Sequence, residues 1–539
     1  MSSNEKTNSK SKSMAFAVFV MVLGNLFTKC SGFLRTVLIS SQFSGKFRDA
    51  YTLSFKFPEL CYNLLIGGAI FSTLAPYMSG ALAVNEEKRG VRTISIFISV
   101  VSVVMLIVCT LGTVFSEQVF GIYNFFLSGK DKIDPEKLEI AAKASKFLFP
   151  QTFFIMLAAL CSGILQSYKK FSSTAFAPTV YNICILLALI LFGGDSLRHV
   201  MSTTAGVLCA SVIYFLFLYI IGFPTLKQFK FRFEPSDSEF RQLLITALPI
   251  MFSASIVQLN SMILDLFTGK FGDVISLNNN AHQIWQIPYT VFAVSISVVM
   301  TPSLSGCYKS KDLKGCSELL SRSIRNILFL TIPSAGIIFI LSPNVVQAVF
   351  KWNDKYTAEN VNDTSELLRF LAIAIVTHSI VHVMNHAFYA IRKTKVPLIA
   401  GIAGLISNPL ICYLLTKNGF GVESLAIAYS STSIIQMVIL CILYCRNTEL
   451  RPKGIIRFIL KSLVCLIVMC VVLYVCNIYL QPVSGVGRAA DKISQIGTLG
   501  AKGLLSFFIY MAVAFVMKMD EAQFWVDRFK NKILKRSSK

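Results

Sequence analysis

The chain has 539 residues, of which 54% are hydrophobic and only 15% are charged, and its mean hydropathy is +0.63. This is too little polar surface to cover the apolar mass of a soluble globular protein, so the composition excludes that class. The formal net charge is +23. A basic chain could bind nucleic acid, but the basic residues gather in short loops between apolar runs, so we expect no nucleic-acid partner.

The apolar runs are continuous and about 20 residues long or longer, which is typical of membrane-spanning helices. The sequence therefore predicts an all-α polytopic membrane protein with about fourteen transmembrane helices. Their expected ranges are 14–43, 49–84, 93–116, 146–167, 174–193, 199–222, 243–268, 278–305, 324–350, 367–391, 396–416, 422–445, 456–480 and 498–518. The first span is too long for the apolar region of a signal peptide and lacks a small-residue cleavage site, so we expect it to be retained.

The loops expected on the side of the N-terminus carry a large excess of Lys and Arg, whereas those on the opposite side are nearly balanced. The positive-inside rule then predicts that both termini are cytoplasmic. The fourteen cysteines lie mostly inside apolar runs and form no CxxC pair. We therefore interpret them as small core residues, and not as disulfides or metal ligands.

A short motif occurs twice. Residues 43–49 read FSGKFRD and residues 267–273 read FTGKFGD, and Pro76 and Asn182 recur as Pro302 and Asn408 at nearly the same offset. An offset of six spans preserves orientation, so the sequence predicts two parallel-repeat lobes around a central cationic cleft. The expected parts are a cytoplasmic tail (1–13), an N-lobe (14–222), a linker (223–242), a C-lobe (243–445), two additional helices (446–518) and a basic cytoplasmic tail (519–539).

Charged residues inside the predicted spans of the first lobe are mainly cationic: Lys29, Arg35 and Lys56 accompany Glu59. Charge at membrane depth is costly unless it faces a partner or a wet cavity, so these residues are candidates for a substrate path. A guanidinium donates two parallel hydrogen bonds to a phosphate or carboxylate group. The cationic balance therefore predicts an anionic substrate.

The second lobe has a different set of polar residues. Asp265, with an amide such as Asn408, is suited to a monovalent coupling cation, Na⁺ or H⁺; a carboxylate hydrogen-bonded near the membrane interface is the alternative. His378, His382 and His386 follow one another at helical spacing and share a face. Because no nearby carboxylate completes a metal site, we interpret this face as a polar wall, a set of helix–helix hydrogen bonds or a proton-sensing stripe.

The chain contains no GxxxxGK[ST] phosphate loop, so we expect a transporter that is not an ATPase and has no bound cofactor. The membrane potential or a cation gradient would supply the driving force, because moving one charge through 100 mV is worth about 2.3 kcal/mol.

Several segments between about residues 14 and 445 are distinctive: GFLR, DAYTLSFKFPELCYNLLIGGAIFSTLAPYMS, the PSLS segment at 302–305, FYAIRKTKVP at 388–397 and, most specifically, FSSTAFAPTVYN at 171–182. In these segments the chain resembles the MurJ/MviN lipid II flippases of the MOP exporter superfamily. This resemblance implies a bacterial plasma-membrane protein that carries the undecaprenyl-diphosphate-linked peptidoglycan precursor from the inner to the outer leaflet.

The resemblance also implies roles for individual residues. Arg35 falls on the family's essential arginine, Lys29 on a second basic position, and Asp49 on the acid that opens the second span. Two departures matter. Tyr62, next to Asn63, stands where an arginine is common, and Ala281, His282 and Gln283 replace an Ala-Asp-Arg motif. Tyr62, Asn63, His282 and Gln283 are therefore candidates for lining the cleft together with the three histidines.

Three functions stay open at this point. The first is a flippase, for lipid II or for another lipid-linked glycan such as a teichoic-acid or exopolysaccharide precursor. The second is a MATE-like cation-coupled exporter, which we would expect to use carboxylates in its cleft. The third is a scaffold of the cell-wall synthesis machinery that does not transport. We expect a monomer.

Overall fold

The computed structural model describes residues 23–24, 26–65, 74–125, 133–168, 170–391, 393, 395–447, 454–482 and 488–523. Regular secondary structure in this part of the chain is helical throughout, without a strand. Eleven of the described helices are long and apolar enough to cross a membrane, which confirms the polytopic all-α class. The number fourteen stays a prediction, because parts of the first two expected spans, the tail 1–13 and residues 524–539 lie outside the described residues.

The chain divides into two compact units, residues 1–276 and 277–539. In the described part of the first unit, a helix runs unbroken from residue 26 to 42, through Gly32. The helices that follow it in this unit are α2 (Gly45–Ser54), α3 (Lys56–Leu65), α4 (Ala75–Ala83), α5 (Glu87–Val114), α6 (Ser116–Phe125), α7 (Pro135–Ser167), α8 (Phe171–Phe192), α9 (Leu197–Leu226), α10 (Ser238–Leu266) and the 3₁₀ turn η3 (Phe267–Phe271).

Several helices start at a side chain that accepts a hydrogen bond from a backbone N–H of the first turn. Such caps satisfy donors that have no partner within the helix. Asp134 caps α7, Ser196 caps α9 and Asp237 caps α10. In the second unit, Asp312 and Thr357 cap the helices that follow them in the same way. The loop sequences thus determine where these long apolar helices begin.

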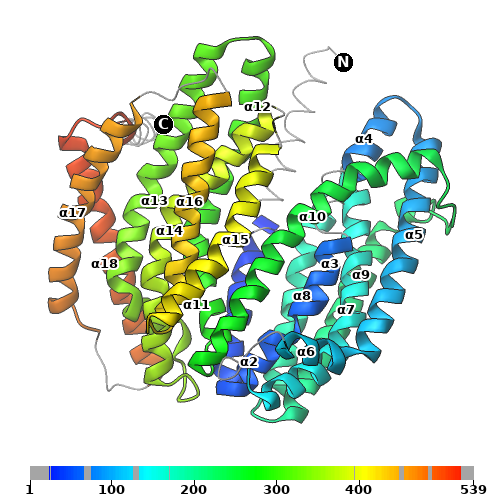
Figure 1. Cartoon of the computed structure of the whole chain (residues 1–539), viewed down its shortest axis with the longest axis horizontal. Coiled ribbons are helices and arrows are strands. Elements are labelled where there is room, and N and C mark those ends of the chain that lie inside the picture. The colour runs from blue at the N-terminus through cyan, green and yellow to red at the C-terminus, as the bar shows by residue number, and fades with distance from the viewer. Residues whose placement is uncertain are drawn as a thin grey trace, which may run out of the picture. The chain divides into compact units, whose positions relative to one another are not determined.

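Helix α7 lies at the centre of the first unit, where it packs against α2, α5 and α9. Figure 1 shows α5, α7, α8 and α9 running side by side. Apolar residues along α7, such as Leu148, Met156 and Leu165, are fully buried in the cores that these helices form. Outward-facing apolar residues elsewhere in the unit, such as Ile220 on α9, are exposed, as expected for helices surrounded by lipid.

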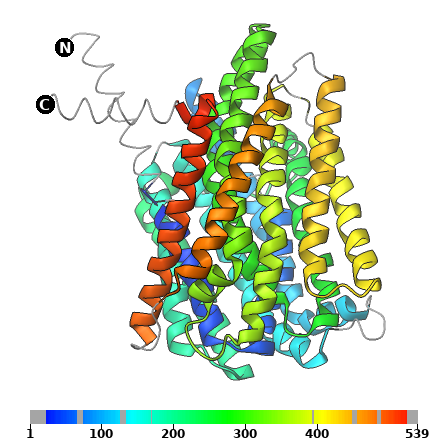
Figure 2. The ribbon, with the colours of Figure 1, turned by 90° about the vertical axis from the view of Figure 1, so that its left-hand side faces the viewer.

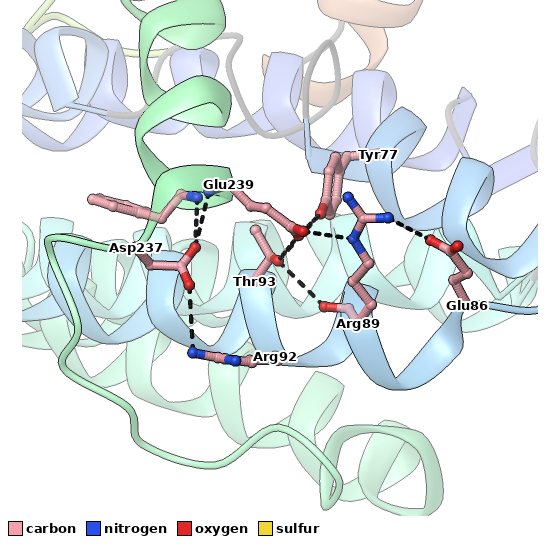
Figure 3. Close-up of polar contacts among 8 residues, drawn as sticks. Tyr77, Glu86, Arg89, Arg92, Thr93, Asp237 and Glu239 are labelled. Carbon is pink, nitrogen blue, oxygen red and sulfur yellow. Dashed lines mark hydrogen bonds and ion pairs between the residues drawn. The ribbon is translucent and has the colours of Figure 1, made fainter.

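Helix α10 packs on α3 and α5 and therefore belongs to the first compact unit. The sequence repeat placed this helix, as the expected span 243–268, at the start of the second lobe. The division into repeat lobes stays a prediction, while polar contacts fix both ends of α10 to the first compact unit. At its N-terminal end, Glu239 accepts hydrogen bonds from Tyr77 (2.8 Å), Thr93 (2.8 Å) and Arg89 (2.5 Å), as Figure 3 shows.

A long helical segment, 275–309, leads into the second unit and is followed by further long helices. The segment begins as α11 (Ile275–Pro288), passes through a π-helical turn, η4 (Tyr289–Val294), and continues as α12 (Ser295–Lys309). The remaining helices are α13 (Leu313–Phe350), α14 (Ala358–Ala390), α15 (Lys395–Lys417), α16 (Glu423–Asn447), α17 (Ile455–Tyr479) and α18 (Arg488–Val516).

Helix α14 packs between α13 and α16, and α15 packs on α16. The last two helices, α17 and α18, pack on each other and on α13; Figures 1 and 2 show them in orange and red alongside green α13. One core connects these elements and includes Phe329 of α13, Phe388 of α14 and Tyr510 of α18. The two additional helices are thus part of the apolar core of the second unit.

Candidate functional site

Two residues that the sequence predicted for different roles form one ion pair. Nζ of Lys56 on α3 lies 2.6 Å from Oδ2 of Asp265 on α10, and the two side chains are only 7% and 1% exposed. Lys56 also donates a hydrogen bond to Oγ of Ser261 (3.0 Å). A buried charge is tolerated when it has an opposite charge and hydrogen-bond partners, and here each group supplies the other's partner. The pair therefore fixes α3 to α10 and neutralises Lys56 in this conformation.

A second polar contact joins the same two helices. Nε2 of Gln258 donates a hydrogen bond to Oε2 of Glu59 (3.2 Å), about one turn after Lys56 on α3 and about two turns before Asp265 on α10. The carboxyl group of Glu59 is exposed, unlike that of Asp265. Tyr62 and Asn63 follow on α3 and are half-buried, and Tyr62 packs against the apolar core of the first unit.

Arg35 lies on the first helix and contacts α8. Its Nη1 atom lies 3.4 Å from Oδ1 of Asn182, whose Nδ2 atom donates to the carbonyl of Thr28 and to Oγ of Ser31 (both 3.2 Å). The hydroxyl of Thr179, on the same face of α8, lies 3.0 Å from that of Thr28. Asn182 and Thr179 therefore attach α8 to the first helix and orient Arg35, which is half-buried.

These contacts give a physical role to the segment FSSTAFAPTVYN. Its last residue, Asn182, uses both its oxygen and its nitrogen to contact the first helix, as only a side-chain amide can. It takes up one of the five N–H donors of the Arg35 guanidinium. Lys29, one and a half turns before Arg35, is exposed on the same helix.

Asp49 is fully buried at the start of α11. Its carboxylate accepts hydrogen bonds from the backbone N–H groups of Ser276 (2.8 Å) and Ile275 (3.2 Å). A carboxylate at a helix N-terminus satisfies free donors and interacts favourably with the helix dipole. This position gives Asp49 a structural task in the first unit, where it holds the beginning of the helix that carries His282.

The two copies of the repeated motif are linked by one lysine. Nζ of Lys137 on α7 lies 2.6 Å from Asp273 and 3.7 Å from Asp49, the acid at the equivalent position of the other copy. It also donates to the carbonyl of Gly272 (2.8 Å). Lys137 was not predicted from the sequence. It lies in the first turn of α7, where a lysine is unremarkable, and its partners are remote in the chain. The duplicated Gly-Lys-Phe-x-Asp pattern was the only signal that could have prompted a search for a shared cation.

The predicted histidines of the second unit lie in an aromatic cluster. Nδ1 of His382 lies 2.9 Å from the hydroxyl of Tyr289, and Nδ1 of His386 lies 3.0 Å from the hydroxyl of Thr301. The Tyr289 ring also contacts that of His378, at 5.1 Å between centroids. These contacts join α14 to the segment around the π-helical turn.

His282 belongs to the same cluster. It accepts a hydrogen bond from Nε1 of Trp285 (3.0 Å) and packs edge-on against Tyr429, at 4.8 Å between ring centroids. Tyr429 and Trp285 also contact His378. The aromatic partners were not singled out from the sequence, because isolated aromatic residues in an apolar run are indistinguishable from core residues. Gln283, the next residue of α11, is exposed, and Asn408 is fully buried on α15.

The chain was compared with known proteins. A family model described as "Lipid II flippase MurJ" matches residues 41–490. A probable lipid II flippase MurJ of Rickettsia prowazekii is 25% identical and aligns over 94% of this chain and 97% of its own length. The lipid II flippase MurJ of Burkholderia cenocepacia is 23% identical over 94% and 98%.

Solved structures show the same fold. A lipid II flippase MurJ in an inward closed conformation has a TM-score of 0.74 at 22% identity, covering 92% of this chain and 99% of that one. A multidrug-resistance MATE transporter of the MOP superfamily, in an inward-facing conformation, has a TM-score of 0.63 at 15% identity, covering 80% and 97%.

The helical fold and these likenesses define the class of the protein as a multi-pass helical membrane protein with the fold that these two solved structures share. Within that class, the chain belongs to the lipid II flippase MurJ family, because the family model covers most of its length.

Proposed function

We propose that this chain moves lipid II, the undecaprenyl-diphosphate-linked peptidoglycan precursor, from the inner to the outer leaflet of a bacterial plasma membrane, with both termini in the cytoplasm. Family membership supports the substrate class. The observation that carries the assignment to residues is the position of Arg35, a half-buried guanidinium on a membrane helix, oriented by Asn182. The excess of basic residues in one set of loops supports the orientation.

The substrate needs such a site because a diphosphate and sugar hydroxyls would lose their hydration in hydrocarbon. Arg35 donates to the diphosphate in place of water, and exposed Lys29 on the same helix adds a second positive charge. Alternate exposure of these groups to the two sides of the membrane then moves the head group, while the prenyl chain stays in the lipid.

Lys56 and Asp265 have a different part in this proposal. In this conformation Lys56 occupies the place that a coupling cation would take at the Asp265 carboxylate. Binding of Na⁺ or H⁺ at Asp265 therefore requires that Lys56 leaves, which couples the cation to a movement of α10 against α3. The membrane potential or a cation gradient supplies the energy. Transport that persists after both are collapsed would refute this coupling.

Complementation of cells depleted of their lipid II flippase tests the function. We expect the parent chain to restore growth, Arg35→Ala to fail, and Arg35→Lys to restore it partly, since lysine keeps the charge but not the planar fork. Arg198→Ala, at an exposed arginine of the first unit, is the matched control and should behave as the parent. Failure of a well-expressed parent would indicate another lipid-linked glycan or a role without transport.

A further inference from the structure

A basic pocket lies at one end of the second unit, where the beginnings of α13 and α17 meet the residues that follow α18. Its volume is about 380 Å³. Four cationic side chains and two carboxylates line it: Arg325, Arg457, Lys461, Lys518, Asp520 and Glu521. None of them belongs to the residues proposed for transport, so the pocket needs its own explanation.

Arg325 is a partly buried cation of this pocket. Its Nε atom lies 2.9 Å from Oε1 of Glu521, and the two side chains are 27% and 6% exposed. Its Nη1 atom lies beside the start of α17, because a Cβ added to Gly454 would be 3.5 Å from it. The first N–H groups of α17 have no acceptor within the helix and form the positive end of its dipole. The guanidinium and a helix N-terminus therefore both direct positive potential into the pocket.

The remaining cations add to this potential. Lys461 donates from Nζ to the carbonyl of Met517 (2.7 Å), which holds its ammonium group at the C-terminal end of α18. Arg457 and Lys518 are exposed at the pocket. The two carboxylates balance only half of the four cationic charges. An anion with several oxygen acceptors, such as a phosphate ester, would complete the set.

An apolar strip leads away from this pocket along α17. Ile456 and Leu460 are 78% and 61% exposed, and exposed Val464, Ile467 and Val471 continue the strip at helical spacing. Ile456 and Leu460 directly precede Arg457 and Lys461, about 100° away around the helix, so the strip runs beside the pocket from the start of α17. A ligand that fits both parts has an anionic head and apolar chains, and a soluble phosphate would use the pocket alone.

We propose that this pocket binds the phosphate head group of an anionic phospholipid, with the acyl chains lying along the exposed strip of α17. Basic pockets at the ends of membrane helices are suited to such head groups. In the proposed orientation this end faces the cytoplasm, so the lipid comes from the inner leaflet. The bound lipid joins α17 and the end of α18 to α13. The site is independent of Arg35 and of transport.

The test uses the full chain purified in a neutral detergent, with lipid binding measured by native mass spectrometry. We expect phosphatidylglycerol to bind more tightly than phosphatidylcholine. The double variant Arg457→Ala/Lys518→Ala removes two exposed cations and should weaken phosphatidylglycerol binding by about tenfold or more, since each basic residue near an anionic lipid contributes about 1 kcal/mol. Phosphatidylcholine binding should not change.

A matched control removes two exposed basic residues of the same unit that do not line the pocket, Lys314 and Arg446. Lys314→Ala/Arg446→Ala should bind phosphatidylglycerol as the parent does. Glu521→Gln removes the carboxylate that competes for Arg325 and should strengthen binding. Equal loss in the two double variants, or no loss in either, would overturn the site.

Soluble phosphate is distinguished by competition. Excess glycerol 3-phosphate or inorganic phosphate should displace little phosphatidylglycerol, because neither uses the apolar strip of α17. Complete displacement of phosphatidylglycerol by an equal concentration of either soluble phosphate would show that the pocket is a soluble-phosphate site. It would refute the proposal that the pocket binds a lipid. Because binding is measured without transport, a negative result here leaves the proposed function untouched, and a failed complementation leaves this site untouched.

Discussion

The Nζ atom of Lys56 lies 2.6 Å from Oδ2 of Asp265, and neither side chain reaches the surface of the first unit to a significant extent. This ion pair connects α3 to α10. It is therefore both the main polar contact between these helices and the most direct candidate for a group that responds to a cation.

Removal of one partner of this pair should be much more harmful than removal of both. Lys56→Met leaves a buried carboxylate without its partner, and we expect a loss of about 3–5 kcal/mol in the free energy of unfolding. The double variant Lys56→Met/Asp265→Leu should recover most of it. Thermal denaturation in detergent measures the difference, and additive effects of the two single changes would contradict the pairing.

Lys137 should be needed at the point where the two repeated motifs meet. Lys137→Met leaves Asp49 and Asp273 without their shared cation, and we expect a loss of about 3 kcal/mol or more. Lys143→Met on the same helix is the control. Lys143 forms an exposed i,i+4 pair with Glu139, so its loss should leave the free energy of unfolding almost unchanged. Equal effects of the two changes would show that the bridge does not stabilise the unit.

Asn182 should determine how Arg35 is presented. Asn182→Ala removes the contact and should reduce complementation, whereas Asn182→Asp places a carboxylate beside the guanidinium and cancels its charge. We therefore expect Asn182→Asp to be the more defective variant when both are expressed equally. A more active Asp variant would mean that the charge of Arg35 is not what the substrate uses.

Glu239 should hold the beginning of α10 on α5. Glu239→Gln weakens the hydrogen bonds from Tyr77, Thr93 and Arg89, and hydrogen bonds to charged groups contribute about 1.5–3 kcal/mol each at most. Arg89 is largely exposed, so its hydrogen bond should contribute little. We therefore expect the total loss in the free energy of unfolding to lie in the lower part of the range given for one hydrogen bond. Faster amide exchange in the first turns of α10, with unchanged exchange in α14, is the expected observation; unchanged exchange in α10 would contradict the role.

The lipid pocket should respond to pH through Glu521. Burial raises the pKa of this carboxyl group, and the nearby cations Arg325 and Arg322 of α13 only partly offset the effect, while Asp520 adds to it. Glu521 therefore becomes neutral at a higher pH than an exposed glutamate and releases Arg325. Phosphatidylglycerol binding should strengthen as the pH is lowered through this range. Glu521→Gln should abolish that change, and a pH response retained in the variant would refute the assignment.

The sequence predicted the helical class and the order of the long helices, because apolar length and loop charge are local properties. It could not predict that Lys56 meets Asp265, or that Lys137 joins Asp49 to Asp273, because these contacts depend on how distant helices pack. Repeat counting assigns α10 to the second lobe, and this division stays a prediction; the contacts of Glu239 and Asp265, which hold α10 in the first compact unit, could not be read from the sequence.

The histidines of α14 also show that the sequence does not predict contacts between distant helices. Helical spacing correctly indicated that His378 and His382 face one side of α14, where both contact Tyr289. The partners of that side, Trp285, Tyr289 and Tyr429, had no distinctive sequence signal. The segment FSSTAFAPTVYN was distinctive, but only the structure gives the reason, which is the contact of Asn182 with the first helix.

Transport of lipid II through Arg35 is tested most directly by reconstitution of the purified chain into vesicles that contain labelled lipid II in one leaflet. The label in the other leaflet is followed over time under a membrane potential. We expect transfer by the parent, none by Arg35→Ala, and normal transfer by Arg198→Ala. Transfer by Arg35→Ala at the rate of the parent would contradict this role of Arg35.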